Sequence, residues 1–215
     1  MKSLTLLITG GIGSGKSLVS RYMEELGVPV YDSDSRTKSL YEGELLFRLE
    51  TALGARLRTE DGRFDKKALA RLIFSDNVNM SKMEQVVYPA VIEDFEAWKN
   101  EVSGGVSGGV SDDIGKSGGK IVAMESALAL TKPAFSGIFD IVLAVRAPEE
   151  LRVKRACERD GVDEAAVRER IRNQSVDVSA ADYIIDNDGT PEELRAKTEA
   201  VLREIQVVLS KMNEI

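Results

Sequence analysis

The sequence predicts a three-layer α/β/α fold built on a five-stranded parallel sheet, with a helical insertion and a small helical lid. Short, nearly continuous apolar segments at residues 4–9, 121–125 and 139–145 are typical of strands that are covered on both faces. Helical periodicity separates these segments, and a glycine-rich turn follows the first of them. Strands that alternate with helices form parallel βαβ units, which bind ligands at the carboxyl ends of their strands.

The first three elements are a strand at residues 4–9, a helix at 16–26 and a strand at 28–31. In the helix, apolar residues recur from Leu18 to Leu26 at a spacing of three to four, and Gly27 supplies a stop. The second strand leads into Asp32, Ser33 and Asp34. We therefore expect both carboxylates near the carboxyl end of that strand.

Residues 35–98 read as an interrupted helical insertion between strands. The sequence predicts a turn at Asp61 and Gly62, helix N-caps at Asp65 and Ser75, and a break near Pro89. Residues 103–119 then hold seven glycines and four serines, so this stretch cannot bury much apolar surface. We expect a flexible loop over residues 99–119, away from the chemistry.

The remaining chain supplies two short helices near 149–159 and 164–174, a fifth strand at 183–185 and a final helix. Asp163 is the expected N-cap of the second short helix, and Thr190, Pro191 and Glu193 have the spacing of a capping box. The predicted division is a nucleotide-binding core (1–34, 120–147 and 175–215), a helical acceptor domain (35–98), the loop (99–119) and a lid (148–174).

Composition excludes several classes of function. A net charge of −7 argues against a nucleic-acid-binding surface, and the absence of histidine removes the Ser-His-Asp triad. Any general base should therefore be a carboxylate. No apolar run approaches the ~20 residues of a membrane helix, and the lone Cys157 is read as incidental. We expect a cytoplasmic protein, with no obligate protein partner implied.

Residues 10–17 fit the pattern Gly-x-x-x-x-Gly-Lys-Ser between a strand and a helix, the context of a phosphate-binding loop. Backbone N–H groups of such a loop surround phosphate oxygens, and the helix dipole adds attraction. Lys16 is expected to bridge the β- and γ-phosphates of ATP, and Ser17 to ligate Mg²⁺. The fold is thus of the P-loop NTPase type. The predicted nucleotide-binding residues here are Gly11, Ile12, Gly13, Ser14, Gly15, Lys16, Ser17 and Leu18.

Asp32 and Asp34 are candidates for the chemistry. One carboxylate can assist Mg²⁺ through water while the other receives the proton of an attacking hydroxyl. The alternative is a strand-end turn with solvated carboxylates. Their place at the sheet edge expected to hold the phosphate loop favours the functional interpretation.

Six arginines crowd the two short helices. Pairs such as Glu164 with Arg168 suit a solvated face, but Arg155 with Arg159 and Arg168 with Arg172 place like charges four residues apart. Such pairs become favourable when an anion lies between them. We favour an arginine lid that closes over ATP and excludes water.

Taken together, the motifs resemble the dephospho-coenzyme A kinase family along nearly the whole chain. The matching stretches are residues 9–17 (TGGIGSGKS), 26–30 (LGVPV), 32–34 (DSD), 62–65 (GRFD), 73–76 (IFSD), 159–161 (RDG), Arg170 with Gln174, and 182–189 (DYIIDNDG). Their order makes the match specific.

The resemblance implies ATP-dependent phosphorylation of the ribose 3′-hydroxyl of dephospho-coenzyme A (dephospho-CoA), the last step of coenzyme A synthesis. By that likeness Asp34 is the base, Arg155 is a lid arginine on the phosphates, Arg159 binds the nucleotide, and Asn187 lies near the adenine. Three positions depart from the family pattern: Leu18 replaces a common threonine, Tyr88 a common histidine, and residues 125–127 (ESA) a frequent Asp-x-Pro. Glu125 keeps a carboxylate that can support Mg²⁺ or hold a water.

Two other functions share parts of this pattern. A nucleoside monophosphate or shikimate-type kinase would share the loop, the aspartates and the lid, and would differ only in acceptor contacts. A GTPase-like switch would need a guanine-reading Asn/Thr-Lys-x-Asp motif, which the sequence lacks. Its second motif, Asp-x-x-Gly, occurs at residues 112–115 and 186–189, where four residues prove little.

Overall fold

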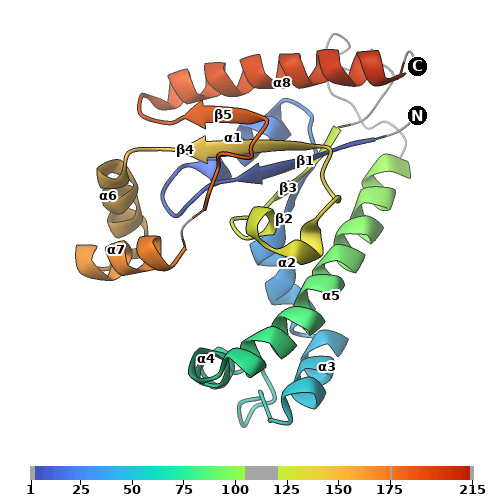
Figure 1. The fold of residues 1–215 in the computed structure, drawn as a ribbon, viewed down its shortest axis with the longest axis vertical. Helices are drawn as coiled ribbons and strands as arrows, with labels where there is room; N and C mark the ends of the chain where they lie inside the picture. The colour runs from blue at the N-terminus through green and yellow to red at the C-terminus, as the bar shows by residue number, and fades with distance from the viewer. Residues whose placement is uncertain (1–2, 105–120, 175, 214–215) are drawn as a thin grey trace. The chain divides into compact units, whose positions relative to one another are not determined.

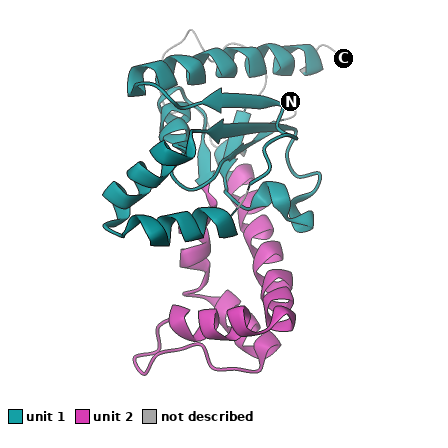
Figure 2. Ribbon diagram, turned by 60° about the vertical axis from the view of Figure 1, so that its left-hand side comes forward, with its two compact units in different colours: residues 1–31, 101–215 teal, residues 32–100 magenta. Residues whose placement is uncertain are grey.

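The computed structural model describes residues 3–104, 121–174 and 176–213. The chain divides into two compact units, Met1–Tyr31 with Glu101–Ile215 (the core unit) and Asp32–Asn100 (the insertion unit), coloured teal and magenta in Figure 2. The predicted α/β class with a five-stranded sheet is confirmed.

The sheet consists of β1 (Leu4–Thr9), β2 (Val30–Asp32), β3 (Ile121–Glu125), β4 (Ile141–Arg146) and β5 (Tyr183–Asp186), in the order β2-β3-β1-β4-β5 (Figure 1). β1 pairs in parallel with β3 and β4, and β4 pairs in parallel with β5. Because β1 is central, the loop at its carboxyl end emerges between the carboxyl ends of β3 and β4. This position brings residues from distant parts of the sequence to one place.

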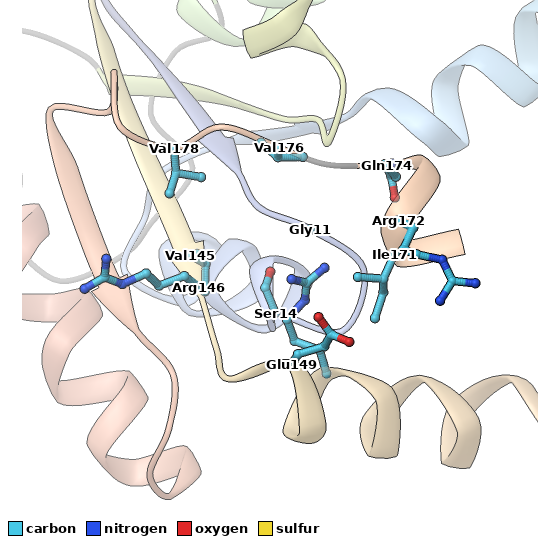
Figure 3. Close-up of a pocket in the computed structure, with 11 residues that line it drawn as sticks. Gly11, Ser14, Val145, Arg146, Glu149, Ile171, Arg172, Gln174, Val176 and Val178 are labelled. Atoms are coloured by element: carbon cyan, nitrogen blue, oxygen red, sulfur yellow. The ribbon is translucent and has the colours of Figure 1, made fainter. Parts of the chain in front are cut away.

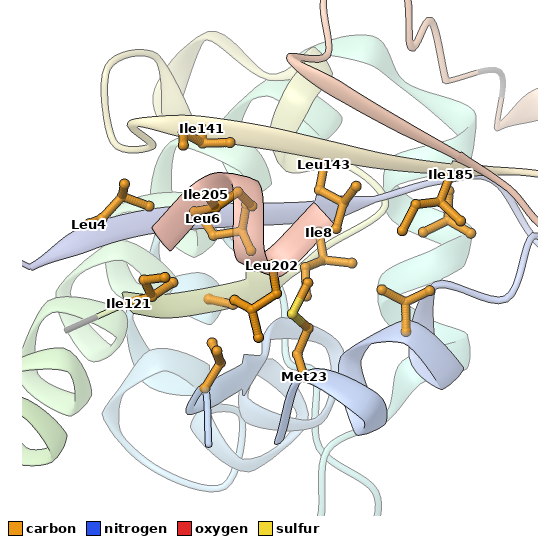
Figure 4. Packing of buried hydrophobic residues seen from close by; sticks show 14 of the residues in the cluster. Leu4, Leu6, Ile8, Met23, Ile121, Ile141, Leu143, Ile185, Leu202 and Ile205 are labelled. Atoms are coloured by element: carbon orange, nitrogen blue, oxygen red, sulfur yellow. The ribbon is translucent and has the colours of Figure 1, made fainter. Parts of the chain in front are cut away.

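Two helices cover one face of the sheet. α1 (Lys16–Glu25) and α8 (Pro191–Asn213) pack against alternate residues of the strands, among them Leu6, Ile8 and Leu143, and bury them almost completely (Figure 4). Leu7 points to the opposite face, toward the short helices η1 (Ala129–Thr131) and η2 (Pro133–Phe135), which line a pocket with it.

Polar side chains cap two helices in the second half of the core unit. α6 spans Glu149–Asp160 and α7 spans Glu164–Asn173, and the Asp163 carboxylate accepts from the N–H of Ala166 at 2.8 Å. At the start of α8, Thr190 and Glu193 exchange hydrogen bonds of 3.0 and 3.2 Å. Both caps were predicted from the sequence and are confirmed.

The insertion unit consists of α2 (Ser33–Leu40), α3 (Glu44–Leu53), α4 (Lys66–Ser75) and most of α5 (Asn77–Gly104). Asp65 caps α4 as predicted, accepting from Lys67 and Ala68 at 2.9 Å. The N-cap predicted at Ser75 was wrong, because Ser75 ends α4. Asp76 instead accepts from the N–H of Val78 at 2.8 Å and so begins α5.

The break predicted near Pro89 was also wrong, since α5 continues through this residue. Proline removes one helical hydrogen bond. However, Val87, Val91 and Phe95 are buried on both sides of it, and this packing fixes the two halves in one helix. The helix also extends through Gly104, so the first residues of the expected loop at 99–119 are helical. Residues 105–119 lie outside the described part of the chain.

No helix among the residues that the structure describes combines the length and apolar character needed to cross a membrane.

Candidate phosphate-binding site

The loop between β1 and α1 has a backbone that only glycine adopts easily. Gly13 and Gly15 have φ of 73° and 97°, and Gly15 is the N-cap of α1. A Cβ on Gly13 would lie 2.3 Å from the carbonyl oxygen of Arg152, which cannot move away without shifting α6. Within the described residues, the N–H groups of Gly13, Gly15, Lys16 and Ser17 have no protein acceptor. They form the donor set that a phosphate needs.

Lys16, Ser17 and Glu125 meet at the start of α1. The Ser17 hydroxyl donates to Glu125 Oε1 at 2.7 Å, and Lys16 Nζ lies 3.5 Å from the same oxygen. Glu125 is the last residue of β3, whose neighbour β1 leads into the loop, so the parallel pairing positions this carboxylate. The two residues predicted to hold a metal are therefore in contact.

Asn187 fixes the loop from the side of β5. Its buried side-chain amide donates to the Ser14 carbonyl at 2.8 Å, and its own N–H donates to the Arg146 carbonyl at 2.8 Å. A Cβ on Gly15 would lie 2.1 Å from the Asn187 amide nitrogen, so the two residues are packed closely. The adenine contact expected for Asn187 stays a prediction; its observed contacts are with the loop.

We predict that Asn187→Ala lowers the free energy of unfolding by about 1–3 kcal/mol, because the buried Ser14 carbonyl loses its donor. Urea unfolding followed by circular dichroism measures this change. Asp188→Ala is the matched control, since Asp188 is exposed and, among the described residues, pairs with the surface Lys197. Equal midpoints for the two variants would contradict an anchoring role for Asn187.

α6 packs directly against the loop. Arg152 Nε donates to the Ile12 carbonyl at 2.9 Å, and Ile12 contacts the small core formed by Val153, Ala156, Val167 and Ile171 of α6 and α7. Sequence reasoning counted Arg152 only among the crowded arginines. Its position three residues before Arg155, on the same side of a helix, is the signal that marks it.

The other arginines have different partners. Arg155 donates to the Asn187 carbonyl at 3.0 Å, which places it beside the loop. Arg159 instead pairs with Asp160 at 2.7 Å. Arg168 contacts three carboxylates, those of Glu149, Glu150 and Glu164, at 2.6–2.8 Å. The arginine cluster is thus divided, and the like-charge contact expected between Arg168 and Arg172 is already offset by acidic neighbours.

A pocket of about 420 Å³ opens beside the loop (Figure 3). Gly11 and Ser14 of the loop line it together with Arg152 of α6 and Arg172 of α7. Arg146 and Glu149 also line it, but Arg146 pairs with Asp186 and Glu149 with Arg168. Its remaining lining residues are Val145, Ile171, Gln174, Val176 and Val178. The pocket suits an anion that contacts the loop.

Asp32 and Asp34 belong to the insertion unit and differ in their surroundings. Asp32 is the N-cap of α2 and accepts from the N–H groups of Asp34 and Ser35 and, at 2.6 Å, from the Ser35 hydroxyl. Partial burial favours its protonated form, yet these hydrogen bonds hold the pKa of the Asp32 carboxyl below its usual value. Asp34 is exposed in the first turn of α2. The roles expected for Asp32 and Asp34 in catalysis stay predictions.

Leu18 packs against the hydrophobic core, and its N–H donates to the Gly15 carbonyl at 3.0 Å. Its predicted contact with the nucleotide stays a prediction. The same holds for Arg159.

A parallel sheet with a Gly-x-x-x-x-Gly-Lys-Ser loop at the end of its central strand defines a P-loop protein of the kinase type. The chain belongs to the dephospho-CoA kinase family, whose model matches residues 4–193. Among its relatives, the dephospho-CoA kinase of Porphyromonas gingivalis is 37% identical over 190 residues, 86% of each chain. That of Geobacillus kaustophilus is 32% identical and covers 94% of this chain and 96% of its own length.

Solved structures show the same fold. A crystal structure from Thermus thermophilus superposes with a TM-score of 0.75 at 30% identity, covering 95% of this chain and 98% of its own. Dephospho-CoA kinase from Campylobacter jejuni superposes with a TM-score of 0.60 at 19% identity, covering 97% and 98%. The second likeness concerns the fold alone.

Proposed function

We propose that this protein transfers the γ-phosphate of ATP to the ribose 3′-hydroxyl of dephospho-CoA, giving coenzyme A and ADP. A bond forms between the 3′-oxygen and the γ-phosphorus, and the bond from that phosphorus to the bridging oxygen of ADP breaks. The hydroxyl proton passes to a carboxylate. Family membership supports this proposal, as do the loop N–H donors that have no acceptor in the described part of the chain.

In this reaction the loop binds and orients the phosphates. The N–H groups of Gly13, Gly15, Lys16 and Ser17 donate to phosphate oxygens, and the Lys16 ammonium stabilises the charge that develops on the transferring group. Arg155, which lies against Asn187 beside the loop, is positioned to add a second cation. Asp34 is the proposed base, because its carboxylate is exposed whereas that of Asp32 caps a helix.

The residues at the start of α1 fit a magnesium ion. Mg²⁺ prefers oxygen ligands and is usually held by one or two protein groups together with phosphate oxygens and water. The Ser17 hydroxyl and the Glu125 carboxylate are in contact at 2.7 Å and are both oxygen donors. When bound, the ion neutralises charge on the β- and γ-phosphates.

Purified protein incubated with Mg-ATP and a panel of acceptors tests the function. The panel comprises dephospho-CoA, nucleoside monophosphates and shikimate, with ADP release as the rate and phosphorus NMR locating the new phosphate. We expect phosphate on the 3′-hydroxyl of dephospho-CoA alone. Preference for another acceptor would keep the kinase class and reject this substrate.

We predict that Glu125→Gln weakens the binding of magnesium at the site, raising half-saturating Mg²⁺ about tenfold or more. Titration of Mg²⁺ in the kinase assay, and in calorimetry of ADP binding, measures the change. Glu158→Gln on the exposed side of α6 is the control. An unchanged Mg²⁺ dependence would remove Glu125 from the metal site.

We further propose that the enzyme works in the cytoplasm, where ATP is available, on small molecules and without nucleic acid or an obligate protein partner. Activity of the purified protein by itself, unaffected by added nucleic acid, is the expected result.

A further inference from the structure

We propose that Arg152 contacts the terminal phosphate of ATP in the pocket beside the loop, as an additional catalytic residue of the proposed kinase reaction. The inference rests on the proposed function only in that the anion is a nucleoside triphosphate. It depends on three features of the core unit: the orientation of Arg152, the charge balance of the pocket, and a buried hydroxyl at its wall.

The first feature is the orientation of the guanidinium group. Its Nε donates to the Ile12 carbonyl at 2.9 Å, and a Cβ placed on Gly11 would lie 2.5 Å from its terminal NH2 nitrogen. The group therefore lies close against the loop backbone at Gly11 and Ile12. Among the described contacts only Nε is used, so the terminal nitrogens keep their donors. A guanidinium group held at Nε presents its two terminal nitrogens in a fixed geometry that suits a phosphate.

The second feature is the charge balance. Arg146 and Glu149, which also line the pocket, are paired with Asp186 and Arg168. Arg152 and Arg172 remain, and neither forms an ion pair within the described residues. Burial lowers the pKa of the Arg152 guanidinium, which nearby Glu149 opposes, so its positive charge is only partly compensated. A phosphate would compensate it fully.

The third feature is the Ser14 hydroxyl. Ser14 lines the pocket, is 1% exposed, and its Oγ has no hydrogen-bond partner among the described residues. Buried hydroxyls usually have a partner. Because the loop N–H groups near the helix start suit the inner phosphates, the pocket at Gly11 and Ser14 is the place for the outermost one.

Binding of ATP and of ADP, measured by calorimetry on the full chain, tests the proposal. For Arg152→Gln we expect ATP affinity to fall about tenfold or more and ADP affinity to change less than about twofold. Arg152→Lys should retain part of the ATP preference, because it keeps the charge and loses the fork. Lys154→Gln, an equal loss of charge at an exposed position of the same helix, should change neither affinity.

Equal losses for ATP and ADP would overturn the proposal, because Arg152 would then only support the Ile12 carbonyl. Unchanged affinities for both would overturn it as well. Thermal melting identifies a variant that fails to fold. If Arg152→Gln fails to fold, the losses of ATP and ADP affinity in Arg152→Lys test the proposal in its place. None of these measurements needs an acceptor, so they test the role of Arg152 separately from the proposed substrate. If the wild-type protein binds ATP but does not phosphorylate dephospho-CoA, only the substrate assignment is rejected.

Discussion

Lys16→Ala should reduce phosphoryl transfer by about 10³-fold or more, to the background of the assay, while the protein remains folded. The ammonium belongs to the first residue of α1, where four loop N–H groups have no protein acceptor among the described residues. Its loss removes charge stabilisation that exists only when a triphosphate is bound. ADP release under saturating Mg-ATP and acceptor measures the effect.

The fold should survive this change, because Glu125 keeps the Ser17 hydroxyl as a partner at 2.7 Å. Lys211→Ala, at an exposed position near the end of α8, is the matched control and should retain wild-type turnover. Near-normal activity of Lys16→Ala would contradict the assignment of the loop to phosphate binding.

Asp34→Asn should lower kcat by about 10²–10⁴-fold and leave the KM for ATP nearly unchanged. An amide cannot take the proton of the attacking hydroxyl, but it has the same size and the same backbone N–H. That N–H donates to Asp32 at 3.0 Å, so the cap of α2 is retained. Steady-state kinetics with each substrate varied separates the two parameters.

Asp32→Asn is the informative partner of this variant. Asparagine is also a good N-cap, so α2 should persist and turnover should fall much less than in Asp34→Asn. The reverse order of effects would make Asp32 the base. It would mean that substrate binding releases the Asp32 carboxylate from Ser35.

The sequence predicted those parts of the site that are continuous along the chain. The loop needs glycine where φ is positive and lysine and serine at the helix start, so its geometry depends on eight neighbouring residues. The caps at Asp65 and Asp163 were predictable for the same reason. A cap depends on hydrogen bonds between a side chain and N–H groups two or three residues later.

Helix boundaries in the insertion unit were less predictable. Ser75 and Asp76 are both suitable caps, and only the observed hydrogen bond of Asp76 to Val78 distinguishes them. A break was predicted at Pro89 because the cost of the helical hydrogen bond that a proline removes can be recognised from the sequence alone. The packing of Val87, Val91 and Phe95 that offsets the cost is tertiary.

By itself the sequence determined the fold class, the phosphate loop and the family, because these depend on local backbone preferences and on a fixed order of motifs. Only the tertiary structure decided which distant side chains complete the site. Glu125 meets Ser17 across 108 residues, Arg152 meets Ile12 across 140, and Asn187 meets Ser14 across 173. Parallel pairing of β3 and β4 with β1, and of β5 with β4, brings their carboxyl ends to one edge of the sheet, and no local pattern shows which side chain then points at the loop.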